Sequence, residues 1–518
     1  MSNAGPALKR ASGPDDLAPA LEAALPGRRF IVVSNREPFE HYFDDATEEV
    51  DVRRPAGGLT SALDPLMQAV GGTWIAWGSG DRDAEVVDER SCVMVPPEDP
   101  RYTLHRIRLS KQDIHLYYAG YANQCLWPLC HLRPSLTRFR ARYWERYLHV
   151  NQRFANAALE DIRRGGRPAA VWFQDYHLAL APAIVREAAP HVALSHFWHI
   201  PFPPVELFRI ATNGADLLRG LLANDVMGFH LPLFGDNFLR SVEVVLNQEV
   251  DWKNRAVRLQ THTCHVRSFP ISIDIDAFRT AVRADDSDAR VQRLRDRYAG
   301  GDMQLGVGVD RVDYSKGLEE KMHALELLWE NYPETRGQLT YVQVAVPSRT
   351  GIEAYDWLNQ RLEQLVWSIN DRFGTEDWRP VHLITDPLSA ERLALLYRAA
   401  DLGIISSLQD GMNLVAKEFV ASQRSDSRGV LILSKFAGAA EELDGAVEVN
   451  PFDPEAFARA IRDALRMPES ERRERYARLK ESMRSIYDWM VEVFEIWGAA
   501  TRGDRTPLSQ ADAWKRSR

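Results

Sequence analysis

The sequence predicts an α/β protein made of two doubly wound domains, each with a parallel sheet covered by helices. Short apolar runs that resemble strands alternate with helical patterns along the chain, which is typical of βαβ units. At 518 residues the chain exceeds the size at which a single hydrophobic core usually stops growing. Its composition, 45% apolar and 26% charged, is ordinary for a globular protein.

The first predicted domain covers residues 29–280 and follows a leader, residues 1–28, which mixes Ala, Pro, Gly and charged residues. We expect this leader to be flexible. Ordered structure begins at RRFIVVSNREP, where Phe30 to Val33 form a short apolar strand. Later segments that contain a strand followed by a polar tip lie at residues 71–80, 169–188, 193–203 and 224–232.

The second predicted domain covers residues 281–480, and the division between the domains falls near 276–300. Its first strand and loop occupy 303–317, and the helix that follows, at 318–333, has one apolar face formed by Met322, Leu325, Leu328 and Trp329. Further strands with polar tips lie at 339–348, 381–389, 401–411, 429–438 and 446–453. The remaining segment, 481–518, begins with an amphipathic pattern (481–499) that we expect to cross back to the first domain.

Charge, cysteine content and missing motifs exclude several classes of protein. The chain has 64 basic and 73 acidic residues and no lysine-rich block, which argues against nucleic-acid binding. No run of ~18 apolar residues and no signal peptide is present, which argues against a membrane protein or a secreted one. Four scattered cysteines without a CxxC pair fit free thiols in a reducing cytoplasm. No GxGxxG fingerprint, P-loop or HExxH motif occurs. We therefore expect a cytoplasmic protein without nucleic-acid or membrane partners.

Polar residues that directly follow the predicted strands are the candidate functional residues, because ligands of open parallel sheets bind beyond the carboxyl ends of the strands. In chain order they are Ser34, Asn35, Arg36, Gly57, Gly58, Asp175, Tyr176, His177, His199, Arg311, Lys316, Arg349 and the run from Asp410 to Glu418. The arginines and the lysine favour anionic ligands. Arg311 and Lys316 precede a glycine and a helix, an arrangement that suits a diphosphate. Together the tips predict a cleft for two phosphorylated ligands.

Each signal taken alone also fits an ordinary structural role. The two cations fit a solvated loop, the glycine pair fits a plain turn at the start of a helix, and His199 fits a hydrogen-bonded histidine of the core. Tyr118 and Trp127, in YYAGYANQCLWP, fit aromatic residues of the core.

The segment SSLQDGMNLVAKEF at 406–419 carries more polar groups than a strand-to-helix turn requires. An ordinary turn needs a glycine and one Asx residue. This segment has Asp410, Gly411 and Asn413 together and then Glu418 on the helix itself. The excess of polar side chains indicates a binding function.

Eight strings of residues closely resemble the trehalose-6-phosphate synthase family, in its order and spacing, from about residue 29 to residue 490. They are SNRE (34–37), RPAGGL (54–59), YYAGYANQCLWP (117–128), QDYHL (174–178), HIPFP (199–203), DRVDYSKGL (310–318), PSR (347–349) and DGMNLVAKE (410–418). RVDYSKG and DGMNLVAKE are highly specific strings.

The resemblance implies the GT-B fold class, in which two Rossmann-like domains face each other across a cleft. It implies an α,α-trehalose-phosphate synthase of trehalose biosynthesis, which transfers glucose from a nucleotide sugar, UDP-glucose by default, to glucose 6-phosphate with retention. It further implies that no metal or other cofactor is required and that the partners are small-molecule substrates. Homo-oligomers are common in the family, so a homo-oligomer is one expectation.

The resemblance also implies a role for each matched residue. The acceptor would be held by Arg36, Tyr118, Trp127, Asp175 and Arg349. The donor would be held by Gly57, Gly58, Arg311, Lys316, Leu388, Asp410, Gly411, Met412, Asn413, Leu414, Val415 and Glu418. The residues nearest the chemistry would be His199, Asp410, Arg311 and Lys316. In the family's favoured scheme the acceptor attacks the face that the diphosphate leaves, so Asp410 would bind sugar rather than act as the nucleophile that retaining hydrolases use.

Four positions depart from the family pattern, and two other functions stay open. The departures are Gln174 for a common His, Ser272 for Gly, Gln409 for Arg, and Leu388 where some members have an aromatic residue. Glucosylglycerol-phosphate synthases, which use glycerol 3-phosphate, form a sister group, although His177 and the GGL at 57–59 follow the trehalose side. A catalytically silent sugar-phosphate sensor, or a relative that couples non-sugar rings, is the other alternative. The donor-site residues are all present, which favours an active enzyme.

Overall fold

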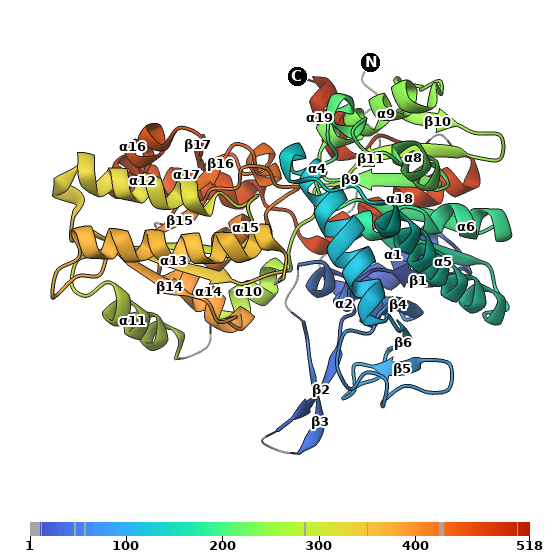
Figure 1. The fold of residues 1–518 in the computed structure, drawn as a ribbon, viewed down its shortest axis with the longest axis horizontal. Helices are drawn as coiled ribbons and strands as arrows, with labels where there is room; N and C mark the ends of the chain where they lie inside the picture. The colour runs from blue at the N-terminus through green and yellow to red at the C-terminus, as the bar shows by residue number, and fades with distance from the viewer. Residues whose placement is uncertain are drawn as a thin grey trace. The chain divides into compact units, whose positions relative to one another are not determined.

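The chain folds into two units, of which unit 1 comprises Met1–Ile271 and Ile486–Arg518, and unit 2 comprises Ser272–Ser485 (Figure 1). The computed structural model describes residues 11, 13–45, 48–55, 58–283, 286–349, 351–423, 429–504 and 506–517. Two chain crossings therefore connect the units, whereas the sequence predicted boundaries at 280/281 and 480/481. The crossings pair with each other inside unit 2, because Ile273 bridges Ser485 and the Ser272 hydroxyl donates to the Arg484 carbonyl at 2.5 Å.

Unit 1 contains, within its described residues, a nine-stranded sheet with the order β10-β11-β9-β8-β7-β1-β4-β6-β5. The strands are β1 (Arg29–Val33), β4 (Thr73–Trp77), β5 (Cys92–Val95), β6 (Tyr102–Ile107), β7 (Ala169–Gln174), β8 (Ala193–Phe197), β9 (Val226–Phe229), β10 (Ala256–Arg258) and β11 (Thr263–Ser268). Neighbours from β11 to β6 are parallel, and the edge strands β5 and β10 are antiparallel. The carboxyl ends of β1, β7 and β8 consequently lie at one edge of the sheet.

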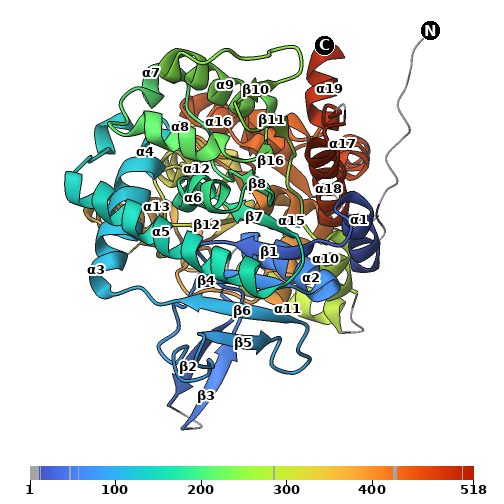
Figure 2. The ribbon, with the colours of Figure 1, turned by 90° about the vertical axis from the view of Figure 1, so that its right-hand side faces the viewer.

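Helices cover this sheet, and a hairpin projects from it. The helices are α1 (Leu17–Ala24), α2 (Gly58–Val70), α3 (Lys111–Asp113), α4 (Trp127–Cys130), α5 (Ala141–Arg164), α6 (Ala181–Ala188), α7 (Val205–Phe208), α8 (Gly214–Leu222), α9 (Pro232–Leu246), α18 (Ile486–Arg502) and α19 (Gln510–Ser517). Strands β2 (Glu40–Asp44) and β3 (Glu49–Arg53) form the hairpin, which extends away from the sheet in both views (Figures 1 and 2). The hairpin follows β1 directly, so it begins beside the polar tip of that strand.

Helix α18 completes the core of unit 1 although it lies more than 200 residues after the rest of that core. Its Phe494 ring packs edge-on against Phe30 of β1 at 5.8 Å, and its Trp489 ring lies 5.5 Å from Trp172 of β7. The Trp489 indole N–H donates to the Phe269 carbonyl at 2.9 Å. Helix α18 therefore supplies buried aromatic side chains to the centre of the sheet.

Helix α1 lies within the predicted flexible leader, so the structure differs from that expectation. Leu17 and Leu21 are buried, and the Arg502 guanidinium of α18 donates to the Ala24 carbonyl at 2.8 Å. Eight residues are too few to show helical periodicity, and an isolated helix of this length is unstable. Its stability comes from α18, at the other end of the chain, and local sequence patterns do not reveal such a contact.

Unit 2 contains a six-stranded parallel sheet in the described residues, with the order β14-β13-β12-β15-β16-β17. The strands are β12 (Gln304–Arg311), β13 (Leu339–Val346), β14 (Val381–Ile384), β15 (Leu402–Ile405), β16 (Val430–Ser434) and β17 (Val447–Val449). The helices are α10 (Ile275–Ala281), α11 (Ser287–Tyr298), α12 (Leu318–Asn331), α13 (Glu353–Phe373), α14 (Ala390–Ala399), α15 (Leu414–Ser422), α16 (Pro454–Leu465) and α17 (Glu469–Ser482). The predicted apolar face of α12 is confirmed, since all four of its side chains are fully buried.

The two sheets, one parallel and one parallel except at its edge strands, confirm the prediction of two doubly wound α/β domains. No described helix combines the length and the apolar character that crossing a lipid bilayer requires.

Candidate active site

The loop after β1 presents Arg36 on a buried polar support. Arg36 is exposed and donates to the hydroxyl of Tyr118 at 3.2 Å. Ser34 and Asn35 are buried beneath it. The Ser34 hydroxyl donates to the Arg36 carbonyl at 2.6 Å, and the Asn35 side-chain oxygen accepts from Tyr117 at 2.9 Å. The neighbouring backbone is thus held in place while the guanidinium is left open to a ligand.

Glu37, the next residue, belongs to a buried ionic cluster that the sequence did not reveal. The Arg106 guanidinium lies 2.8 Å from a Glu37 carboxylate oxygen and 2.9 Å from one of Asp83. The side chain of His41 also contacts Arg106, at 2.8 Å. Burial raises the pKa of Glu37 to about 8, a hydrogen bond with Asp83 acts in the same direction, and the charge of Arg106 opposes both. No motif links these residues, although the cluster anchors the loop that carries Arg36.

A π-helix, η2 (Ile114–Leu126), positions Tyr118, and helix α4 begins with Trp127. π-Helices are rare and occur often at functional sites. The half-buried Tyr118 ring stacks on His177 with centroids 5.8 Å apart and planes 12° apart. Trp127 is only 6% exposed and stacks on His131 at 4.0 Å. Tyr118 therefore lies beside Arg36 at the surface, whereas Trp127 has the burial of a core residue.

Asp175 follows β7 in a strained conformation. Its φ is +70° and its ψ is 171°, a backbone region that residues with a side chain rarely adopt. One carboxylate oxygen accepts from the backbone N–H of Tyr176 at 3.0 Å and from that of His199 at 3.2 Å. His199, which follows the adjacent strand β8, is half-buried. Asp175 and His199 are thus brought together, as the positions of their strands predict.

The glycine pair is only partly described. Helix α2 starts at Gly58, which is exposed, as expected for a residue that a ligand would approach. Gly57 lies outside the described residues.

In unit 2 the loops after β12 and β15 form one polar cluster around Asp410. The Lys316 ammonium lies 2.5 Å from Asp410 Oδ2. The same oxygen accepts from the Ser407 hydroxyl and from the Asn413 amide, both at 3.1 Å. Arg311, the last residue of β12, is exposed. A carboxylate engaged by three donors is a weak nucleophile but a well-oriented hydrogen-bond acceptor, which suits a sugar hydroxyl.

Backbone contacts lock the two loops together. The Ser406 hydroxyl donates to the Lys316 carbonyl at 2.8 Å, and the backbone N–H of Leu408 donates to the Ser315 carbonyl at 2.7 Å. Gly317 has a φ of +62°, and a Cβ there would lie 2.1 Å from the Ser406 carbonyl oxygen. The close approach of the loops therefore requires glycine at 317.

Gly317→Ala is expected to destabilise unit 2 by more than ~2 kcal/mol, because a steric clash adds to the ~1 kcal/mol of left-handed backbone strain. Gly301→Ala is the matched control, since Gly301 has a φ of +68° and a Cβ there would meet no atom within 4 Å. Urea denaturation of both variants measures the difference. Equal losses of stability in the two would show that the loop contact contributes nothing.

Helix α15 begins within the DGMN segment. Asn413, with φ +79°, is its N-cap, and its side-chain oxygen accepts from the Ala416 N–H at 3.2 Å. Gly411 and Met412 are buried, whereas Leu414 and Val415 are half-buried. A Cβ at Gly438 would lie 2.1 Å from the Gly411 carbonyl oxygen. The segment is thus tightly packed on one side and presents the first turn of α15 on the other. Nothing in the structure explains the amide at Gln409.

Glu418, one turn further along α15, is hydrogen-bonded to a residue that the sequence did not single out. Its Oε2 accepts from the Tyr397 hydroxyl of α14 at 3.1 Å. Burial raises the pKa of Glu418 to about 7, against the opposing effect of the Tyr397 hydrogen bond. Both protonation states of the Glu418 carboxyl group are consequently populated near neutral pH.

Arg349, the predicted phosphate ligand after β13, is engaged within unit 2. Its side chain is 4% exposed and lies 2.5 Å from the carboxylate of Asp313, which is fully buried. The Tyr355 hydroxyl lies 2.7 Å from the guanidinium and 3.2 Å from the same carboxylate. Asp313 belongs to the RVDYSKG string, so the sequence singled out both residues but not their pairing.

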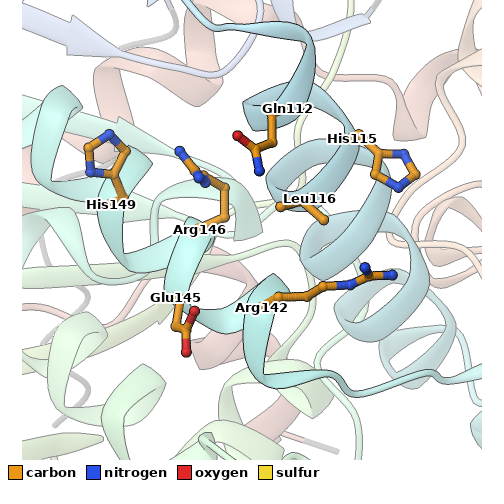
Figure 3. A pocket seen from close by; sticks show the side chains of 7 residues that line it. All are labelled: Gln112, His115, Leu116, Arg142, Glu145, Arg146 and His149. Atoms are coloured by element: carbon orange, nitrogen blue, oxygen red, sulfur yellow. The ribbon is translucent and has the colours of Figure 1, made fainter.

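Two of the surface cavities differ in whether a predicted site residue lines them. Leu388 lines a cavity of about 260 Å³ beside α11 and α14, together with Arg290, Arg293, Arg297 and Arg392. A cavity of about 470 Å³ in unit 1 is lined by the side chains of Gln112, His115, Leu116, Arg142, Glu145, Arg146 and His149 (Figure 3). None of the predicted site residues lines the second cavity. Within the described ranges, no group of three or more His, Cys, Asp or Glu side chains is placed to hold a metal ion.

Comparison with known proteins gives one consistent family. The profile of glycosyltransferase family 20 matches residues 28–496. The chain is 36% identical over 463 residues to an alpha,alpha-trehalose-phosphate synthase (UDP-forming) of Pichia angusta, which covers 87% of this chain and 94% of that protein.

Solved structures agree with this match. An alpha,alpha-trehalose-phosphate synthase (UDP-forming) from Burkholderia xenovorans, in complex with glucose-6-phosphate, aligns with a TM-score of 0.77 at 31% identity, over 89% of this chain and 98% of that one. A trehalose-6-phosphate synthase studied with bisubstrate glycomimetics, for the mechanism of glycosyl transfer with retention, aligns with a TM-score of 0.77 at 30% identity, over 89% and 97%. These alignments confirm the predicted GT-B fold class.

Proposed function

Because the chain belongs to glycosyltransferase family 20, we propose that it is an α,α-trehalose-phosphate synthase. It transfers the glucosyl group of UDP-glucose to glucose 6-phosphate with retention and releases UDP. The observation that carries this proposal is the extent of the match, since a UDP-forming relative aligns over 94% of its own length. All the candidate residues, from Arg36 to Glu418, lie within the matched range 28–496.

The donor is assigned to unit 2. Arg311 and Lys316 bind the diphosphate as two cations at the end of β12 and the start of α12, where the helix N-terminus adds favourable charge. Asp410 and the DGMN segment bind the transferred glucose, and Glu418 accepts from the ribose hydroxyls. Leu414, Val415 and Leu388 contact the nucleoside. Gly57 and Gly58 of unit 1 are assigned to the donor by the family resemblance alone.

The acceptor is assigned chiefly to unit 1. Arg36 and the Tyr118 hydroxyl bind its phosphate, and their 3.2 Å hydrogen bond aligns the two groups before the ligand arrives. Asp175 contacts acceptor hydroxyls through its carboxylate. Trp127 is assigned a supporting position, since it is buried. Arg349 of unit 2 is assigned to the acceptor by the family resemblance alone.

The chemical step needs a leaving group and a proton acceptor. The bond between the anomeric carbon and the UDP oxygen breaks, and the acceptor hydroxyl forms its bond on the same face, which preserves the α-configuration. The acceptor proton passes to the departing phosphate oxygen. Lys316 and Arg311 stabilise the charge that develops on the diphosphate. Asp410, held by three donors, orients the sugar.

The binding of UDP-glucose is expected to strengthen as the pH rises from 6 to 8, since the carboxylate form of Glu418 accepts from the ribose hydroxyls. With a pKa of about 7, the ionised fraction rises from about one tenth to about nine tenths over that range. Calorimetric titration with UDP-glucose, without acceptor, should show an increase in affinity of about 5- to 10-fold. Glu418→Gln should bind weakly at every pH. An equal pH dependence in that variant would remove Glu418 from the ribose site.

The function is tested by offering the purified protein UDP-, ADP- and GDP-glucose, each with glucose 6-phosphate or glycerol 3-phosphate. Mass spectrometry identifies the product, and the coupling constants of its anomeric protons give the configuration. We expect trehalose 6-phosphate with UDP-glucose. A glycerol product alone would assign the chain to the sister group, and no product with any pair would favour the sensor.

Three finer properties belong to the same proposal. The reaction requires no metal or other cofactor, so activity should persist in excess chelator. The enzyme works in the cytoplasm, which is supported by the free thiols of Cys92, Cys125, Cys130 and Cys264. A homo-oligomer is the assembly that is common in the family, and sedimentation analysis would test whether this chain forms one.

A further inference from the structure

Gln174 and His199 form a hydrogen-bonded pair at the edge of the unit 1 sheet. Gln174 ends β7 and is fully buried, and His199 follows β8, whose residue Phe197 lies in register with Gln174. The Gln174 side-chain oxygen lies 2.8 Å from His199 Nε2. The side-chain nitrogen of Gln174 is buried and has no hydrogen-bond partner among the described residues. Because only the oxygen of this buried amide has a hydrogen-bond partner, its contact with His199 indicates a specific role.

An amide oxygen can only accept a hydrogen bond, so Nε2 of the ring must carry the proton. If the ring is neutral, Nδ1 then bears a lone pair and is an acceptor. His199 as a residue is half-buried, and the described residues give its Nδ1 no hydrogen-bond partner. The tautomer of His199 therefore follows from the orientation of the Gln174 amide, whose oxygen faces the ring.

The surroundings keep the ring neutral. Burial holds the pKa of His199 well below its usual range, and the neighbouring His230 and His196 act in the same direction. The His230 ring packs edge-on at 5.5 Å and the Phe197 ring lies at 4.6 Å. Asp175, the nearby carboxylate, accepts from the backbone N–H of His199 at 3.2 Å.

We infer that Gln174 is a positioning residue that fixes His199 as the neutral Nε2–H tautomer and so presents Nδ1 as a hydrogen-bond acceptor for a hydroxyl of the transferred sugar. The identity of that hydroxyl rests on the proposed function, but the tautomer does not. Through His199, Gln174 therefore favours a substrate group that donates a hydrogen bond to Nδ1. A group that can only accept a hydrogen bond would not bind there.

The first test is spectroscopic and independent of activity. Long-range ¹H–¹⁵N correlation spectra of enzyme labelled at histidine distinguish the two neutral tautomers and the imidazolium. Comparison with His199→Ala assigns the His199 signals. We expect a protonated Nε2 and an unprotonated Nδ1 from about pH 5 to about pH 8. A protonated Nδ1, in either the neutral or the charged ring, would overturn the inference even in a fully active enzyme.

Two variants extend the test to function. Gln174→Met keeps the length of the side chain and removes both the acceptor and the unsatisfied amide nitrogen. We expect it to fold at least as stably as the parent, to show a mixture of tautomers, and to lose about 5- to 10-fold in kcat/KM for the donor, as for one hydrogen bond. An unchanged tautomer together with an unchanged kcat/KM would contradict the assignment.

Gln174→Glu places a carboxylate against the ring and should stabilise the imidazolium, in which Nδ1 is a donor. The pKa of His199 should rise, and kcat/KM should fall as the pH decreases through that value, which adds a second acidic limb to the one that Glu418 gives the parent enzyme. A merely structural role for Gln174 would change stability without adding this limb. If no substrate pair gives product, the proposed function fails, while the spectra still decide the tautomer.

Discussion

Replacing Lys316 by alanine is expected to lower kcat/KM for UDP-glucose by about 10²- to 10³-fold, the cost of removing one preorganised donor to a developing negative charge. Lys316 lies 2.5 Å from Asp410 and belongs to the loop that ends at Gly317. The acceptor KM should change little, because the ammonium is assigned to the donor. Steady-state kinetics with each substrate varied in turn separates the two effects.

Lys435→Ala is the matched control for this variant. Lys435 is exposed, its ammonium lies 5.3 Å from the centroid of the Phe436 ring, and Phe436 accepts the Asp410 backbone N–H at 3.1 Å. The Lys435→Ala change therefore removes a positive charge close to the loop that carries Asp410, but it leaves the Asp410 carboxylate unchanged. We expect its kcat/KM to stay within about two-fold of the parent value. A loss of less than three-fold in Lys316→Ala would exclude Lys316 from transition-state stabilisation.

Arg349→Ala is expected to have the largest effect on stability, about 3–5 kcal/mol, because it leaves the carboxylate of Asp313 buried without its counter-charge. The same change should raise the acceptor KM by at least ~10-fold through the loss of a charge-assisted contact with phosphate. Thermal denaturation should show the first effect as a fall of about 2–4 °C in Tm per kcal/mol.

A double variant separates these two consequences. Asp313→Asn combined with Arg349→Gln removes both charges at once and leaves two amides able to hydrogen-bond, so much of the stability should return. The acceptor KM should stay high. Recovery of both properties would mean that Arg349 supports the fold and has no part in phosphate binding.

The sequence predicted the elements whose signal is local. The strands β7 and β15 are buried in parallel sheets and appear in the sequence as apolar runs. Helix α12 is buried on one side and appears as four apolar residues at helical spacing. The π-helix η2 escaped prediction, since its wider hydrogen-bond spacing leaves no distinct pattern of polar and apolar residues.

The candidate site shows the same division. Specific strings identified Lys316, Asp410 and Arg349, but their ion-pair partners lie 94 and 36 positions away along the chain. Tyr397 and Arg106 belong to no string, and only the folded chain places them against Glu418 and Glu37. The sequence therefore identified the candidate residues, whereas their charge states and their ion-pair partners could be found only in the folded structure.

Helix α18 lies near the C-terminal end of the chain, so it is synthesised long after the other core elements of unit 1. The stretch Ser272–Ser485 leaves the ribosome before that helix and takes roughly 10–40 s to synthesise at about 5–20 residues per second. During this interval Phe30 and Trp172 lack their aromatic neighbours Phe494 and Trp489. By the end of this interval the whole sequence of unit 2 has been synthesised, so unit 2 can fold first. The N-terminal portion of unit 1 still has exposed apolar surface at that time. Loss of the last 33 residues would therefore harm the half of the molecule that is synthesised earliest.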